Sequence, residues 1–158
     1  MKLHLGCGKK ILPGYINIDA TCSDVVGDIR DLSSYEDNSV DEILAVHVWE
    51  HFWINEVLDI ATEWKRVLKP DGKLILEMPC KDKVFMIIKS SYSDNENLTL
   101  WAMYGDPSTI RTEQDLHKWL WSVRDIRTLL DQAGFSKVEI FEPEYHVAIR
   151  DMRVEAKK

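Results

Sequence analysis

The sequence predicts an α/β domain built on a mostly parallel sheet, with an antiparallel hairpin at its C-terminal edge. Short apolar strands alternate with helix or loop through the first 80 residues, which is typical of parallel α/β sheets. Residues 40–48 are almost continuously apolar from Ile43 to Val48, as in a central strand buried on both faces. Two late strands, at 136–141 and 151–156, have no long helix between them, and this favours a hairpin.

Size and composition indicate one globular domain spanning residues 1–158. The hydrophobic fraction is 45% and the charged fraction 30%, the balance of an ordinary folded protein. No apolar run approaches the roughly 18 residues of a membrane span. Lys2 and His4 interrupt the N-terminus where a secretory signal needs its apolar core. The three cysteines are odd in number and lack paired spacing, which favours reduced thiols and a cytoplasmic location.

The charge of the chain argues against nucleic acid as a partner. Twenty basic and 27 acidic residues leave a net charge of −7. Proteins that bind phosphate backbones usually carry a basic stripe. The densest basic stretch, at 64–73, straddles a predicted helix end, where cations offset exposed carbonyl groups. The six tryptophans are explained by core packing or by a homodimer interface.

The first three strands are short and closely spaced. Residues 3–5 alternate as a strand that runs into a Gly-Cys-Gly turn at 6–8, and further strands are predicted at 15–19 and 24–28. The segment Ile11-Leu12-Pro13-Gly14 leaves no room for a helix of normal length. The first helix of the α/β pattern is therefore expected to be reduced to a loop.

A helix is predicted after the central strand. Apolar residues recur at spacings of three and four, which places them on one face. Pro70-Asp71-Gly72 is expected to stop the helix and turn the chain into a buried strand at 73–78. The apolar face comprises Ile54, Val57, Leu58, Ala61, Trp64 and Leu68.

Residues 80–121 are interpreted as an insertion, or cap, over one end of the sheet. Segments 84–92 and 98–107 have helical character on either side of a loop at 93–97.

Regular structure returns at Ser122, which forms a predicted capping box with Asp125. Gly134 lies where the C-terminus of this helix needs a glycine. The last strand, at 151–156, alternates apolar and charged residues and is expected to have a half-exposed edge. The apolar face of the helix comprises Ile126, Leu129, Leu130 and Ala133.

The opening motif predicts a nucleoside site. Ligands of open parallel sheets bind beyond the carboxyl ends of the strands. A glycine turn admits a ligand close to the backbone, and Asp19 can accept hydrogen bonds from ribose hydroxyls. A pyrophosphate would also need a third glycine and a helix N-terminus, and both are missing. The pattern therefore favours adenosine on a short uncharged or cationic linker.

Six segments occur in an order that resembles the class I S-adenosylmethionine (SAM)-dependent methyltransferases, most closely the small branch typified by methyltransferase-11 domains. The resemblance covers nearly the whole chain except 80–121. It implies a Rossmann-like, seven-stranded sheet with an antiparallel edge hairpin, SAM as cofactor and S-adenosylhomocysteine as product. The segments are "LHLGCG", "NID", "GDIRDL", "DNSVDEILAVHVWEHF", "RVLKPDGKLILEMP" and "LLDQAGFSKVEIF".

The resemblance also implies cofactor contacts. Gly6, Cys7 and Gly8 would line the methionine and ribose part, and His47 would lie near the sulfonium end. Cys7, between two glycines, is interpreted as a small residue that permits backbone approach rather than as a nucleophile.

The nucleoside contacts come from the next two strands. Asp19 would hold the ribose hydroxyls with Ala20 against the adenine, while Asp28 would accept from the adenine amino group and Ile29 would pack on the ring. One departure concerns His4, which stands where the family usually has an acid that helps to place the amino group of the cofactor.

The predicted acceptor is a small molecule or a saccharide, because a cap of about forty residues leaves little protein to enclose a larger one. Positioning the acceptor in line with the methyl group supplies most of the catalysis, and a general base helps when the acceptor is a hydroxyl or a protonated amine. His51 and His117 are the candidate bases, and His117 could line the acceptor pocket with Tyr104 and Trp119.

Three other functions remain open. Loss of turnover, suggested by His4 and the short cofactor loop, would leave a silent nucleoside-binding module of the same fold. A nicotinamide oxidoreductase is disfavoured by the missing pyrophosphate helix. His47, Glu50 and His51 match H-x-x-E-H, the inverted zinc-protease motif. That motif needs one helix carrying both histidines, whereas His47 ends a strand-like run, so no metal is expected, and Glu50 and His51 are read as loop residues bonded to backbone.

Overall fold

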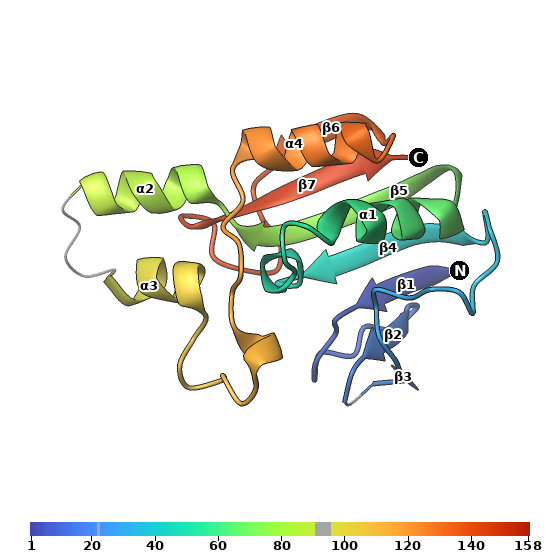
Figure 1. Cartoon of the computed structure of the whole chain (residues 1–158), viewed down its shortest axis with the longest axis horizontal. Coiled ribbons are helices and arrows are strands. Elements are labelled where there is room, and N and C mark those ends of the chain that lie inside the picture. Colours follow the sequence, from blue (N-terminus) through green and yellow to red (C-terminus); the bar gives the residue numbers. More distant parts are fainter. Residues whose placement is uncertain (22, 91–95) are drawn as a thin grey trace.

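The structure is a computed structural model that describes residues 1–21, 23–90 and 96–158. It contains a seven-stranded sheet of order β3-β2-β1-β4-β5-β7-β6, shown in Figure 1. The strands β1 to β5 are parallel where they pair, and β7 is antiparallel to both β5 and β6. The predicted fold is confirmed. The strands are β1 Lys2–Leu5, β2 Ile16–Asp19, β3 Val25–Val26, β4 Val40–Val46, β5 Leu68–Pro79, β6 Ser136–Phe141 and β7 Asp151–Lys157.

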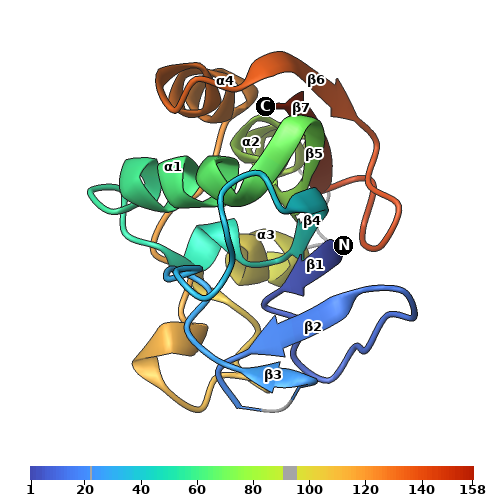
Figure 2. The ribbon, with the colours of Figure 1, turned by 90° about the vertical axis from the view of Figure 1, so that its right-hand side faces the viewer.

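The helices fall into two groups. Two of them, α1 and α4, cover one face of the sheet (Figure 2), and two, α2 and α3, lie beyond the carboxyl ends of β4 and β5 (Figure 1). The second group belongs to the predicted cap. The α-helices are α1 Val57–Val67, α2 Lys81–Lys89, α3 Glu96–Tyr104 and α4 Val123–Gln132, and short 3-10 turns lie at Trp49–His51 and Glu113–Asp115.

The helix-covered face holds the apolar core. Leu3, Ile43 and Val154 project from three strands into the same cluster. Trp64 of α1 is fully buried there, and its ring meets that of Trp49 edge to face with 5.3 Å between centroids. The predicted capping box of α4 is formed, and its predicted apolar residues are buried in this core.

The opposite face of the sheet is polar and is covered by two loops instead of helices. His4 and Asn17 are buried on it and hydrogen-bond to each other over 3.0 Å. Asn17 also accepts from the backbone N–H of Leu12, which fixes the loop 6–15 against the sheet. No helix forms within 6–15, as predicted.

The second covering loop, 142–150, is held in the same way. The buried Glu77 carboxylate of β5 accepts the backbone N–H groups of Glu144 and Tyr145 and pairs with buried Arg153 of β7 over 3.0 Å. The two loops also meet, because Lys10 lies 4.6 Å from the ring centroid of Tyr145. Buried polar side chains therefore position both loops.

The prediction for the first helix was partly wrong. Helix α1 begins at Val57, and Ile54 and Leu58 are exposed, at 45% and 40%. Leu58 is about 100° around the helix from buried Val57 and faces away from the core. Residues 70–72 do not end the helix, because β5 already pairs with β4 at Leu68 and the chain bulges before the pairing resumes at Lys73.

Two further predictions were corrected. The predicted loop 93–97 is helical from Glu96 on, and residues 93–95 lie outside the described residues. Strand β7 is not a half-exposed edge, because it lies between β5 and β6 and buries Asp151 and Arg153 as well as its apolar side chains.

Cys7 and Cys80 form no disulfide, and Cys22 lies outside the described residues. Within those residues, no helix has the length and hydropathy needed to span a bilayer.

Candidate functional site

A cavity of about 690 Å³ lies at the carboxyl edge of β1 and β2. Most of the residues predicted to hold the cofactor line it: Gly6, Asp19, Ala20, Asp28 and Ile29. Cys7 and Gly8 are not among the described residues that line this cavity. Residues that the sequence reasoning missed also contribute, and they include Arg30, Trp53, Gln114 and Lys118. Their positions depend on loops that no local motif marks.

The glycine turn is required by its geometry. Gly6 has φ +67°, and a Cβ there would lie 2.4 Å from Cγ2 of Val48. Only glycine fits both the left-handed conformation and the contact. The turn is closed by the N–H of Gly8, which donates to Oδ2 of Asp19 over 2.8 Å. Gly8 itself has φ +51° and open space where a Cβ would project.

Asp19 therefore has a structural role as well as a place in the cavity. Its second carboxylate oxygen, Oδ1, accepts from the N–H and the hydroxyl of Thr21. A carboxylate offers about four lone-pair positions, so acceptor capacity remains beside the cavity, and the hydroxyl of Thr21 can rotate away. The spacing of eleven residues between Gly8 and Asp19 lets the acid close a parallel β1–β2 connection that has no helix.

Asp28 lies across the cavity in an ion pair. The Arg30 guanidinium donates from Nε and Nη2 to the Asp28 carboxylate at 2.7–3.0 Å. These hydrogen bonds hold the pKa of Asp28 below its usual value. Both side chains are about half exposed, so the pair is screened by solvent and can open to share the carboxylate with a ligand.

A second cavity, of about 470 Å³, lies under α3 and is lined by His47, His51, His117, His146, Trp101 and Arg150, among others. A smaller cavity of about 220 Å³ joins the two. It shares Gly6, Asp19 and Ile29 with the first cavity and His47 with the second. His51 lines all three, so the three cavities adjoin one another at His51, between the glycine turn and the cap.

His47 directly follows β4, with φ +54°. Its Nδ1 donates to Oε1 of Glu50 over 2.7 Å, and its Nε2 donates to Oδ2 of Asp151 over 3.1 Å. Burial alone would lower the pKa of His47, but Glu50 and Asp151 outweigh it and raise the pKa to about 9. Residue 47 is thus an imidazolium between two carboxylates, beside the junction of the cavities.

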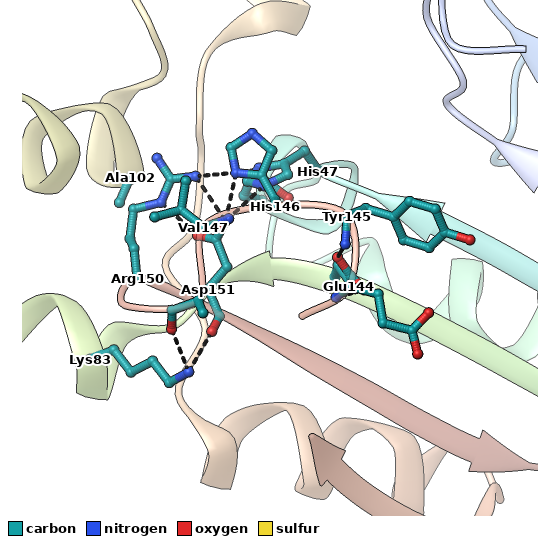
Figure 3. A network of polar contacts seen from close by, with 12 residues as sticks. His47, Lys83, Ala102, Glu144, Tyr145, His146, Val147, Arg150 and Asp151 are labelled. Atoms are coloured by element: carbon teal, nitrogen blue, oxygen red, sulfur yellow. Dashed lines mark hydrogen bonds and ion pairs between the residues drawn. The ribbon is translucent and has the colours of Figure 1, made fainter. Parts of the chain in front are cut away.

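Arg150 and His146 complete this network, in which His47, His146 and Arg150 converge on Asp151 (Figure 3). Sequence reasoning missed the other three members of this cluster, His146, Arg150 and Asp151. A signal was available, because an antiparallel strand starts at the edge where its parallel neighbours end. Residues just before β7 must therefore lie beside the cavities.

His51 and His117 face each other at the second cavity with ring centroids 4.8 Å apart. Nδ1 of His51 donates to the carbonyl of Gln114 over 3.0 Å, and Nδ1 of His117 donates to that of Ala102 over 2.8 Å. Carbonyls only accept, so each Nε2 carries the lone pair in the neutral ring. Burial lowers the pKa of His117.

The aromatic partners suggested for His117 lie elsewhere. Tyr104 and Trp119 are 60% and 40% exposed, and the described lining of the second cavity contains Trp101 in their place. Trp101 and Tyr104 lie three residues apart on α3, only about 60° around the helix axis, and sequence alone could not select between them.

Solved structures with the same fold cover almost the whole chain. A SAM-dependent methyltransferase from Archaeoglobus fulgidus matches with a TM-score of 0.68 and 18% identity, over 99% of this chain and 85% of that one. A SAM-dependent methyltransferase from Methanosarcina mazei matches with a TM-score of 0.64 and 20% identity, over 99% and 91%. The fold of this chain is the one that these SAM-dependent methyltransferases have.

The sequence comparison agrees: residues 14–76 match the methyltransferase domain family known as Methyltransf_11. A further match, to a translation factor GUF1 homolog, mitochondrial, of Babesia bovis, is 33% identical over 104 residues and includes 66% of this chain. The chain spans only 14% of the length of that curated relative.

Proposed function

We propose that this domain transfers a methyl group from SAM to a small-molecule or saccharide acceptor bound in the second cavity. The observation that carries the proposal is the row of adjoining cavities that runs from Gly6 past His51 to His117. The first cavity has the features of a nucleoside site, and the second is lined by four histidines beside the cap.

The residues at the first end fit the cofactor. The Gly6 turn leaves room for close approach to the backbone, Asp19 retains acceptor capacity for ribose hydroxyls, and Ile29 offers an apolar surface for the adenine. No helix N-terminus follows the turn within 6–15, so a pyrophosphate would lack its usual site. When bound, SAM supplies a methyl group on a positively charged sulfur.

The second end suits a compact polar acceptor. Its volume of about 470 Å³ lies within the range of small-ligand sites, roughly 300–1,000 Å³. Trp101 provides a flat apolar surface, and Asp106 and Asp115 provide hydrogen-bond acceptors. An aromatic surface beside carboxylates supports a polyhydroxylated acceptor, such as a saccharide.

The chain orients the acceptor and manages its proton. Nε2 of His51 or His117 can accept a proton from an acceptor hydroxyl or ammonium group, because each Nδ1–H is already held by a carbonyl. His47 is held by Glu50 and Asp151 and places a fixed positive charge at the junction. That charge attracts a developing oxyanion.

Calorimetric titration with S-adenosylhomocysteine tests the proposal. Binding at one site per chain is expected, and Asp19→Ala should weaken it roughly ten- to hundredfold, the loss expected for charge-assisted hydrogen bonds. Asp59→Ala removes an exposed acid of α1 and is the matched control. Absence of binding at millimolar ligand, or tighter binding of NAD, would contradict the proposal.

The silent module of the same fold is separated by a second measurement. SAM turnover on a panel of saccharide and small-molecule acceptors should be detectable, and it should fall in His51→Ala or His117→Ala. Binding of S-adenosylhomocysteine without methyl transfer from SAM to any acceptor of the panel would favour the silent module.

A further inference from the structure

We propose that Glu50, His51 and His117 form a binding site for one divalent transition-metal cation at the junction of the two cavities. One ligand atom from each residue lies within 4.8 Å of the others. Two imidazole nitrogens and one carboxylate oxygen are a common three-ligand set for catalytic metal ions, which keep further positions open.

The outer partners that such ligands need are already present. Metal-bound histidines usually donate their other N–H to a carbonyl or a carboxylate. The carbonyls of Gln114 and Ala102 do this for His51 and His117. Both Nε2 lone pairs are thereby left for a cation. The third ligand, Glu50, is oriented by His47, which donates to Oε1.

The carboxylate of Glu50 also has an unexplained atom. Glu50 is 1% exposed, and its Oε2 has no hydrogen-bond partner among the described residues. A buried unpaired carboxylate oxygen is costly, and an ion at the site is one standard explanation.

The segments that carry the ligands are joined through their backbones. The N–H groups of Lys118 and Trp119 both donate to the carbonyl of Glu50, over 2.6 and 3.2 Å. Nε2 of His117 lies 3.9 Å from Oε1 of Glu50, whereas ligands on one tetrahedral zinc ion are about 3.3 Å apart, given bonds of about 2.0–2.1 Å. These two atoms would therefore have to come about 0.6 Å closer to bind one ion.

A neighbouring cluster, His47, His146 and Asp151, is also compact but is already satisfied. Both ring nitrogens of His47 donate to carboxylates. Oδ2 of Asp151 accepts from His47, His146 and Arg150, and Oδ1 accepts from Nε of Arg150. Its polar groups are therefore already paired, so the site is assigned to the other cluster.

The role of the metal rests on the proposed function, although metal binding itself does not. His51 and His117 line the second cavity, so the open coordination positions would be available to an acceptor oxygen. Coordination lowers the pKa of a bound hydroxyl. A histidine whose lone pair binds a cation cannot also be a base, and this site therefore replaces the general-base role of His51 and His117.

Titration of Co²⁺ into the untagged, chelator-treated protein tests the site through calorimetry and visible absorption. One Co²⁺ per chain is expected. His51→Ala and His117→Ala should each weaken binding roughly a hundredfold or more, because outer partners alone are worth about 10–100-fold. Glu50→Gln replaces the carboxylate by an amide of similar size and so tests whether the carboxylate is a metal ligand. His146→Ala, which alters the neighbouring cluster, is the matched control and should retain the wild-type affinity for Co²⁺.

No binding of Co²⁺ to the wild-type protein at millimolar metal would overturn the inference, as would unchanged affinity in both His51→Ala and His117→Ala. Loss of binding in His146→Ala alone would move the site to the other cluster and overturn it too. S-Adenosylhomocysteine is titrated into the same samples. If the protein binds S-adenosylhomocysteine but not Co²⁺, the metal site is wrong and the proposed function stands. If it binds Co²⁺ but not S-adenosylhomocysteine, the proposed function is wrong.

Discussion

The two faces of the sheet bury different kinds of side chain under different kinds of cover. On the helix-covered face, Trp64 and the apolar side chains of five strands pack into one cluster under α1 and α4. On the loop-covered face, the buried residues include His4, Asn17, Glu77 and Arg153, and their partners are largely backbone groups of the covering loops. The first face supplies stability, and the second positions loops that lead into the site.

This division explains where the site residues come from. The loop 6–15 begins with the Gly6 turn of the first cavity, and the loop 142–150 brings His146 and Arg150 to the second cavity. Apolar packing is non-directional, whereas a hydrogen bond to a backbone N–H specifies position. A face built from buried polar groups can therefore hold catalytic loops in register without helices.

The largest effect is expected from breaking the helix-covered face. Trp64→Ala removes a fully buried indole that contacts Trp49 and Phe52 and should lower the free energy of unfolding by about 3–5 kcal/mol. Leu58→Ala, on the exposed side of the same helix, should change it by less than about 0.5 kcal/mol. Urea unfolding measures both, and equal losses would contradict the assignment of the core to this face.

The next effect concerns the loop-covered face. Arg153→Ala leaves the buried Glu77 carboxylate without its guanidinium and should cost about 3 kcal/mol. The double variant Glu77→Gln/Arg153→Met removes both charges and keeps one acceptor oxygen for the N–H group of Glu144 or of Tyr145. It should recover much of the loss in urea unfolding. A double variant no more stable than Arg153→Ala would show that the charges themselves are needed.

The contribution of Asp151 to the stability of the folded protein is expected to depend on pH. Burial would raise the pKa of Asp151, but His146, His47 and Arg150 lower it well below its usual value. A lowered folded-state pKa gives stability that is present above the unfolded value, about 3.9, and is lost as pH falls through the folded value. Asp151→Asn should therefore be less stable than wild type by about 2 kcal/mol at pH 7.

The difference in free energy of unfolding between the wild type and Asp151→Asn is measured by urea unfolding. It should become smaller as the pH is lowered below about 4. Asp59→Asn, which alters an exposed acid, should show no such difference at either pH. A difference for Asp151→Asn that grows in acid would contradict the sign of the shift.

The smallest effect tests the contact between the two covering loops. Lys10→Met removes the ammonium group 4.6 Å from the ring centroid of Tyr145, a contact worth about 0.5–1 kcal/mol. Amide hydrogen exchange in loop 6–15 should quicken by a few-fold while exchange in α1 is unchanged. Lys10→Arg retains a cation and should resemble the wild type.

Much of the helix-covered face could be predicted from the sequence, because apolar spacing carries the signal for burial. The apolar run of β4, the capping box of Ser122 and the buried face of α4 were predicted on that basis and are confirmed. The loop-covered face could not be predicted in this way. The alternation of Met152 and Arg153 in β7 has the same pattern whether the charged side meets water or a buried partner, so β7 was taken for an exposed edge.

The site residues also fall into two groups, those that local motifs predict and those that only tertiary contacts bring together. Gly6, Asp19 and Ile29 belong to local motifs and were placed at the cavity by the sequence. The approach of His117 to Glu50, 67 positions apart in the chain, and of Asp151 to His47 depends on tertiary contacts that no local spacing records. His51 was expected to be a loop residue bonded to backbone, and it is, yet its free Nε2 gains meaning only beside His117.

A crystal structure with S-adenosylhomocysteine tests the central claim most directly. We expect the adenosine in the cavity of about 690 Å³, with the ribose hydroxyls donating to Asp19 and the adenine against Ile29. A nucleoside bound elsewhere, or an Asp19 carboxylate turned away from the bound ribose, would contradict the account.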